Sequence, residues 1–239
     1  MAPKVLFLRN DPLATEAMLG EAFTDLGFDT EVFDVVPAGR AAAPAGAVSF
    51  PEPGGYDVIV PLGARWPVYD EALQASWVGT EMALMRDAAA AGTALLGVCF
   101  GGQLLAQAFG GTVARSPHPE IGWYDIVSDR PDIVPPGRWF QWHFDRWTLP
   151  AGATELARTA GASQAFVLDR TLALQFHPEV DAALLKTWIG EDADEIAAAG
   201  LDPDELMTRT TELAEVAAPR LRSLVGGFLS LVAGHSRPS

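Results

Sequence analysis

The 239-residue chain is predicted to form an α/β fold, with a mainly parallel central sheet between helices and antiparallel strands added near one edge. Three observations predict this class. Short apolar runs alternate with segments of helical spacing up to residue 109, which is typical of βαβ units. After residue 110 short strand candidates follow one another closely. The segment 181–231 then has helical spacing.

The first half begins with an apolar run at residues 4–8, which predicts a buried strand. It continues with a helix at 11–26, a strand at 30–36, a Pro-, Ala- and Gly-rich loop at 37–55, a strand at 56–62, a helix at 71–91, a strand at 93–98 and a helix at 101–109. The second half contains strand candidates at 112–114, 123–127, 139–141, 165–168 and 172–175, which we interpret as antiparallel additions and hairpins. Since no repeat or convincing linker divides the chain, we expect a single domain over 1–239 with a helical C-terminal extension at about 181–235.

The composition is that of a globular enzyme, with 49% hydrophobic and 20% charged residues. The net charge of −15 disfavours nucleic acid and anionic membranes as partners. No apolar stretch is long enough to span a bilayer and no signal peptide is evident, so we expect a cytoplasmic protein. Residues 191–215 contain nine acids and one base (Arg209), a net charge of −8. We interpret this segment as a solvated helical face; a docking surface for a basic partner is the weaker alternative.

The only cysteine, Cys99, lies where a predicted buried strand runs directly into a helix. Gly97 and Gly101 stand two residues on either side of it, as in the Gly-x-nucleophile-x-Gly turn of α/β enzymes. A sulfur at a helix N-terminus is favoured as a thiolate, because unpaired N–H groups and the helix dipole stabilise an anion. The alternative is an inert, buried cysteine. The flanking glycines favour a nucleophile.

Among the four histidines, His177 is the candidate partner because it directly follows the predicted strand 172–175. Ligands bind at the carboxyl ends of parallel strands, where Cys99 and His177 are both expected. Glu179, two residues later, can orient the imidazole. Of the other histidines, His118 lies between prolines, His235 lies in a polar tail, and His143 is considered below.

Two backbone donors are expected to stabilise an oxyanion formed near Cys99. One is the N–H of Phe100, and the second is that of Gly63 or Ala64, in the loop after the strand 56–62. We expect no metal, since the pairs His143/Asp145 and His177/Glu179 lack a well-spaced third ligand. We expect no cofactor, since the chain has no phosphate-binding loop.

The segments Gly97–Gln103 and Phe176–Glu179 together resemble the signatures of the class I (triad) glutamine amidotransferases, especially the members similar to the glutaminase domain of GMP synthase. The resemblance implies a flavodoxin-like three-layer sandwich. It also implies that Cys99 forms a γ-glutamyl thioester as ammonia leaves, and that water then hydrolyses the thioester to glutamate. In this reaction His177 moves the proton and Glu179 orients His177.

The resemblance further implies substrate-binding roles for Gln103 and for a loop at His143, Phe144 and Asp145. Gln103 has an alternative role, capping the first helical turn. Two positions depart from the family pattern: Gly63-Ala64-Arg65 replaces Gly-Gly-Pro, and Phe144 replaces the glycine of His-Gly-Asp.

Glutamine or another γ-glutamyl compound is therefore the expected substrate, with a synthetase subunit as a potential acceptor of the ammonia. Two alternatives remain. One is a partner-free γ-glutamyl amide hydrolase that acts on a small conjugate, and the other is a catalytically silent regulatory subunit. Phe144 favours both alternatives over an ordinary glutaminase.

Overall fold

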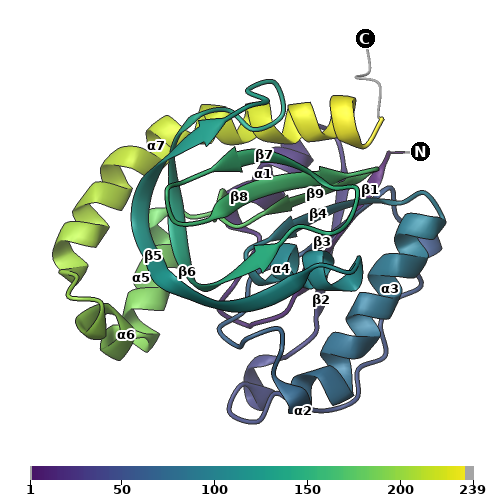
Figure 1. The fold of residues 1–239 in the computed structure, drawn as a ribbon, viewed down its shortest axis with the longest axis horizontal. Helices are drawn as coiled ribbons and strands as arrows, with labels where there is room; N and C mark the ends of the chain where they lie inside the picture. Colours follow the sequence, from purple (N-terminus) through teal and green to yellow (C-terminus); the bar gives the residue numbers. More distant parts are fainter. Residues whose placement is uncertain (1, 235–239) are drawn as a thin grey trace.

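The computed structural model describes residues 2–234, which form one nine-stranded sheet with helices packed against it (Figure 1). The strands are β1 (Lys4–Arg9), β2 (Asp29–Asp34), β3 (Val58–Pro61), β4 (Ala94–Val98), β5 (Thr112–Ser128), β6 (Gly137–Thr148), β7 (Thr154–Arg158), β8 (Ser163–Leu168) and β9 (Thr171–Leu174). The main helices are α1 (Ala17–Asp25), α2 (Glu71–Leu73), α3 (Gly79–Ala90), α4 (Phe100–Ala108), α5 (Ala182–Glu191), α6 (Ala193–Ala198) and α7 (Pro203–Gly227).

The parallel half of the sheet has the order β2-β1-β3-β4-β9, and its central strands are fully buried. Helices α1 and α7 pack on one face, with Phe23 and Phe228 in the core between helix and sheet. Helices α3 and α4 cover the other face, where Met85 and Leu104 are buried. The predicted three-layer α/β arrangement is confirmed, because alternate residues of these strands bury their side chains on opposite faces.

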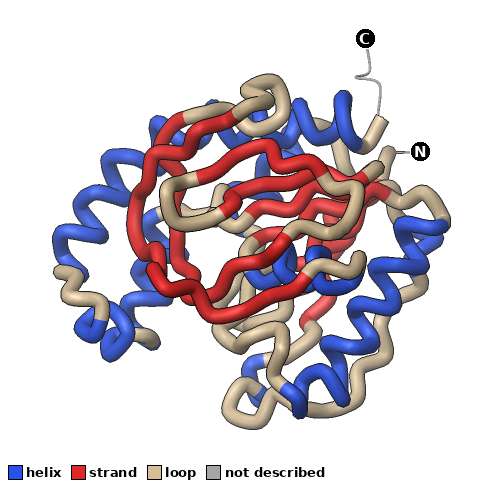
Figure 2. Tube along the Cα trace, viewed as in Figure 1, coloured by secondary structure: helices blue, strands red, loops and turns tan. Residues whose placement is uncertain are grey.

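The antiparallel half continues as β9-β8-β7-β5-β6, and its long strands curve across the sheet (Figure 2). The candidates 112–114 and 123–127 belong to one strand, β5, whose register shifts between Arg115 and Glu120. Strand β7 was not predicted. Strand β9 pairs antiparallel with β8 but parallel with β4, so its interpretation as a purely antiparallel addition was wrong.

The segment His143–Asp145 lies inside strand β6, so the loop implied for it was also wrong. Strand β6 extends over Gly137–Thr148 because it pairs with β5 from Thr112 to Arg115 and again from Glu120 to Ile126. The site residues expected on a flexible segment are therefore held by a strand ladder.

Two predicted helices are shorter or less regular than their sequence patterns indicate. The first begins at Ala17 rather than at residue 11, because the Asp11 carboxylate accepts the Leu13 N–H in a turn. The helix predicted at 71–91 is interrupted by a π-helical turn at Gln74–Val78, where Ser76 leaves helical geometry.

The helical tail covers the sheet rather than extending away from it, and α7 runs along the upper edge of the view in Figure 1. The C-terminal half of α7 buries Leu221, Leu224 and Val225 in the core shared with α1. Most of the acidic segment 191–215 is exposed. The predicted extension to about 235 ends outside the described residues, as does His235. Over the described part of the chain, none of the helices combines the length and the apolar character that a bilayer crossing requires.

A carboxylic acid, Glu81, is completely buried on α3 beneath the sheet. Its Oε1 accepts a hydrogen bond from Asn10 Nδ2 at 3.3 Å. Burial raises the pKa of Glu81 to about 8, and the hydrogen bond from Asn10 only partly opposes the rise. Glu81 is therefore neutral in the folded chain at pH 7, whereas in the unfolded chain it is ionised.

We predict that Glu81→Gln flattens the pH dependence of stability. The folded pKa of Glu81 is raised, so its contribution is present below pH 4.5 and is lost as the pH rises toward 8. Each pKa unit is worth about 1.4 kcal/mol, so the variant should become more stable than the wild type by a few kcal/mol above pH 8. Urea unfolding from pH 5 to 9 measures the difference, and a constant difference would contradict the assignment.

Candidate active site

Cys99 occupies a sharp corner between β4 and α4, with its backbone at φ 50° and ψ −107°. Few non-glycine residues adopt a positive φ, and such strained positions cluster at functional sites. The Cys99 N–H donates to Leu174 O on β9 at 2.8 Å, and its carbonyl accepts the Gln103 N–H. The corner is therefore held by both the neighbouring strand and the helix that it starts.

The flanking glycines are needed because the backbones approach too closely for side chains. A Cβ at Gly97 would lie 2.6 Å from Gly101 O, and a Cβ at Gly101 would overlap the carbonyl of Pro61. Gly102 is equally constrained, because its Cβ would lie 2.6 Å from Leu174 O. The glycine pattern around Cys99 thus reflects the contact of α4 with β3 and β9.

His177 and Glu179 form a buried pair beyond the end of β9. His177 Nδ1 lies 2.7 Å from Glu179 Oε1, with side-chain exposures of 5% and 1%. The His177 N–H donates to Phe140 O on β6 at 2.8 Å. The Trp188 ring packs edge-on against the imidazole, with centroids 5.0 Å apart. The imidazole is therefore fixed from both sides.

Burial lowers the pKa of His177, but the Glu179 carboxylate and the Cys99 sulfur raise it more, to about 10. At neutral pH the ring therefore carries a positive charge, next to the Glu179 carboxylate. Its Nε2 has no hydrogen-bond partner within the described structure. A cationic ring with a free Nε2 beside a thiol can donate a proton to a group that the sulfur attacks.

Cys99 and His177 open into a cavity of about 160 Å³. Eight of the ten predicted site residues line it: Cys99, His177, Gly63, Ala64, Gln103, His143, Phe144 and Asp145. The other two, Phe100 and Glu179, are buried and are not among the lining residues. The site residues expected from separate parts of the sequence are thus brought together.

Gln103 and His143 make buried polar contacts in the wall of the cavity. Gln103 Nε2 lies 3.3 Å from both Asp145 O and Gln175 Oε1. His143 is only 3% exposed, and its ring nitrogens contact Glu120 Oε2 and Asp145 O, each at 3.1 Å. These contacts fix the backbone of β6 at Asp145.

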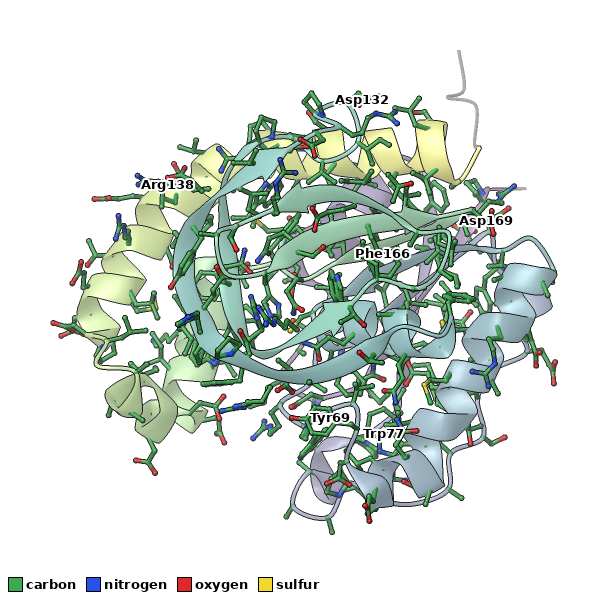
Figure 3. All side chains as sticks on the ribbon, viewed as in Figure 1. Tyr69, Trp77, Asp132, Arg138, Phe166 and Asp169 are labelled. Carbon is green, nitrogen blue, oxygen red and sulfur yellow. The ribbon has the colours of Figure 1, made fainter. Side chains whose placement is uncertain are left out.

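At the outer end of the cavity, Asp145 Oδ1 accepts a hydrogen bond from the Tyr69 hydroxyl at 3.1 Å (Tyr69 is labelled in Figure 3). The Arg115 guanidinium lies 3.9 Å from the same oxygen and 4.5 Å above the Phe144 ring. This end therefore combines a carboxylate, a guanidinium and the face of an aromatic ring, so it can bind a molecule that carries both a positive and a negative charge.

Several residues of the site were not predicted from the sequence. Gln175 lies next to the sulfur, with its Nε2 at 3.8 Å from Cys99 Sγ, although it is the last residue of the strand predicted at 172–175, two residues before His177. Asp11 follows β1 and lines the cavity, so its place at a strand end was a usable signal. The sequence contains no such signal for Arg115 and Trp188, because they reach the site only through the curvature of β5 and the packing of α5.

Among the described residues, no group of three or more His, Cys, Asp or Glu side chains is arranged to hold a metal ion.

We predict that Gly101→Ala destabilises the fold by a few kcal/mol, because the new methyl group overlaps the Pro61 carbonyl. Gly190→Ala is the matched control, since a Cβ there meets nothing within 4 Å and helix α5 accepts alanine. Thermal unfolding compares the two variants. Equal melting temperatures would mean that the corner is looser than described.

We predict that Glu179→Gln lowers the pKa of His177, because it removes the adjacent carboxylate that raises this pKa. Proton NMR of the imidazole Cε1–H, followed against pH, measures the midpoint. Glu120→Gln removes a buried carboxylate that contacts His143 instead, and it should leave the His177 midpoint in place. An unchanged midpoint in Glu179→Gln would show that the carboxylate does not control the ring.

Comparisons with known proteins identify the family of this chain. The family model described as glutamine amidotransferase class I matches residues 56–191, which is more than half of the chain. A glutamine-hydrolysing GMP synthase of Nitrobacter hamburgensis is 32% identical over 202 residues, covering 73% of this chain and 36% of that protein. The corresponding enzyme of Aeropyrum pernix is 36% identical over 148 residues, covering 54% of this chain and 29% of that protein. The chain thus spans about a third of the length of these relatives.

The crystal structure of a glutamine amidotransferase from Thermotoga maritima superposes with a TM-score of 0.83 at 27% identity, covering 96% of this chain and 99% of that chain. The similarity therefore extends beyond the matched segment to the β1–β2 region and the C-terminal helices. The chain belongs to the class I glutamine amidotransferase family.

Proposed function

We propose that this chain hydrolyses the side-chain amide of glutamine, through a thioester on Cys99, to give glutamate and ammonia. The observation that carries the proposal is the position of Cys99 at a strained corner, beside the buried His177–Glu179 pair and open to a cavity. Family membership supports the same chemistry. Residues 1–239 would form one catalytic domain with a helical C-terminal extension at about 181–235.

In the proposed reaction, the Cys99 thiolate attacks the amide carbon and the carbonyl oxygen becomes an oxyanion. The N–H of Phe100 and that of Gly63 or Ala64 stabilise this charge. The intermediate collapses, the C–N bond breaks, and the nitrogen leaves as ammonia after taking a proton from His177. Water then attacks the thioester, His177 accepts its proton, and the carboxylate product leaves as the thiolate is restored.

Glu179 holds His177 in this cycle by its Nδ1, which leaves Nε2 free for the transferred proton. A cationic ring at rest favours the first step, because the proton needed by the leaving nitrogen is already in place. The amino-acid end of the substrate would lie against Gln103, His143, Phe144 and Asp145. There Asp145 would attract the α-amino group.

A synthetase is the proposed acceptor of the ammonia, because the matched relatives are named GMP synthases and this chain spans only part of their length. A γ-glutamyl conjugate is the second candidate substrate. The observation in its favour is Phe144, whose ring with the stacked Arg115 stands where the family pattern has glycine. Assays with N-substituted γ-glutamyl amides beside glutamine separate these two substrates.

We predict that Cys99→Ala lowers amide hydrolysis at least about 10⁴-fold, because no other group can form the thioester. The fold should survive, because alanine keeps the Cβ of this buried corner residue and removes only the sulfur. Ammonia and glutamate release from glutamine, followed with the purified wild type and variant, measures the effect. Comparable release by the two chains would contradict the nucleophile assignment.

A further inference from the structure

We infer that Asn10, Asp11 and Glu81 are positioning residues, which hold the peptides on both sides of Gly63 and Ala64, the loop proposed to supply the second oxyanion donor. The inference rests on the proposed amide hydrolysis and deepens it. Asn10 and Asp11 immediately follow β1, the strand next to β3, whose end carries this loop. Both side chains are buried, with residue exposures of 0% and 2%.

Asn10 acts on the peptide that joins Leu62 to Gly63. Its Nδ2 donates to Leu62 O at 3.1 Å, and the contact is fully buried. In a trans peptide the C=O and the following N–H lie in one plane and point in opposite directions. Because the Leu62 carbonyl points to Asn10, the Gly63 N–H points away from Asn10.

The side of the peptide opposite Asn10 faces Cys99, because Asn10 follows β1, Cys99 follows β4, and β3 lies between these two strands. A Cβ built on Gly63 would lie 3.3 Å from His177 Cε1 and 3.9 Å from Cys99 Cβ, so Gly63 borders both side chains directly. A reversed peptide would turn a carbonyl oxygen toward the developing oxyanion and repel it. The Asn10 contact therefore selects the peptide orientation that donates.

Glu81 holds Asn10 in turn. Its Oε1 accepts from the same Nδ2 at 3.3 Å, so the amide nitrogen is shared between Glu81 and Leu62 O. Glu81 belongs to α3, which packs against the sheet, and its side chain has no exposure to solvent. The orientation of the Gly63 peptide is thus linked to a packed helix rather than to a mobile loop.

Asp11 acts on the other end of the loop. Its Oδ2 accepts the Arg65 backbone N–H at 3.2 Å and the Arg65 Nε–H at 2.7 Å, while Oδ1 accepts from Arg65 Nη2 at 3.2 Å. The Arg65 N–H is therefore already used, which leaves Gly63 and Ala64 as the donors. The guanidinium also balances a carboxylate that lines the cavity and would otherwise oppose an oxyanion.

Asn10, Glu81 and Asp11 are therefore positioning residues, which act through the Gly63–Ala64 backbone and do not touch the substrate carbonyl. A loop held at both ends needs no partner to assemble it, so this chain alone should hydrolyse its substrate. Donors that are in place before the reaction lower the barrier without a reorganisation cost.

The test uses Asn10→Leu and Asp11→Ala in the full chain, assayed with glutamine and with γ-glutamyl-p-nitroanilide as a second probe. Each variant should lower kcat about tenfold to a hundredfold with little change in KM, because the oxyanion exists only in the transition state. Alkylation of Cys99 by iodoacetamide, which forms no oxyanion, should keep the wild-type rate.

Thr210→Val is the matched control for the loss of a buried hydrogen bond. Thr210 Oγ1 accepts from Trp123 Nε1 at 2.9 Å, on α7, and neither residue lines the cavity. This variant should lose comparable stability in urea unfolding but retain the wild-type kcat. A loss of kcat in Thr210→Val equal to that in Asn10→Leu would assign the effect to general destabilisation.

The outcomes separate the two proposals. A wild-type kcat in both folded variants would overturn the positioning role and leave the amide hydrolysis intact. Wild-type chain that hydrolyses neither probe while Cys99 is rapidly alkylated would overturn the preformed loop. Turnover that persists in Cys99→Ala would overturn the proposed function itself.

Discussion

The close approach of helix α4 to strands β3 and β9 is the constraint on which the site depends. It is possible only because Gly97, Gly101 and Gly102 lack side chains, and it places Cys99 in a strained backbone conformation. The strain raises the energy of one residue, and the buried packing of α4 against the parallel strands compensates for it. A side chain on such a corner is held at the carboxyl end of β4 by the helix that follows it.

The parallel order of the sheet then determines which residues meet the sulfur. The parallel strands β1, β3, β4 and β9 all have their carboxyl ends on the same side of the sheet. The residues that follow these ends therefore lie close together although they are far apart in the sequence: Asn10, Gly63, Cys99 and His177. The antiparallel strands add a wall that parallel strands alone would lack. Strand β6 contributes the Phe140 carbonyl that holds His177 and the segment His143–Asp145, which lines the cavity.

Local signals in the sequence were sufficient to predict much of this arrangement. Glycines around Cys99, and a His-Pro-Glu segment after an apolar run, reflect contacts that few other residue types permit. The parallel strands were recognisable because both of their faces are buried, which makes them continuous apolar runs. The positions of Gly63 and Ala64 could be inferred because they follow the next such strand.

Other features depend on contacts between distant segments, which no local pattern records. The sequence of β7 shows only a weak alternation of apolar and polar residues, and β5 is interrupted by a register shift. Neither segment therefore resembled one regular strand. The long pairing of β5 with β6 turned an expected loop at His143 into a strand. Gln175, Arg115 and Trp188 reach the site only through this tertiary arrangement, and the Asn10 contact joins residues 52 positions apart.

The position of β1 and α7 limits how this chain can be shortened. The family model begins at residue 56, yet β1 lies between β2 and β3, and α7 seals the face beneath it. A fragment cut to residues 56–191 would expose the inner edge of β3 and the apolar residues that Leu224 and Phe228 now cover. Such a fragment would retain the sulfur, the imidazole and the carboxylate but would be prone to aggregate. The recognisable signature of the family is therefore smaller than the unit that can fold.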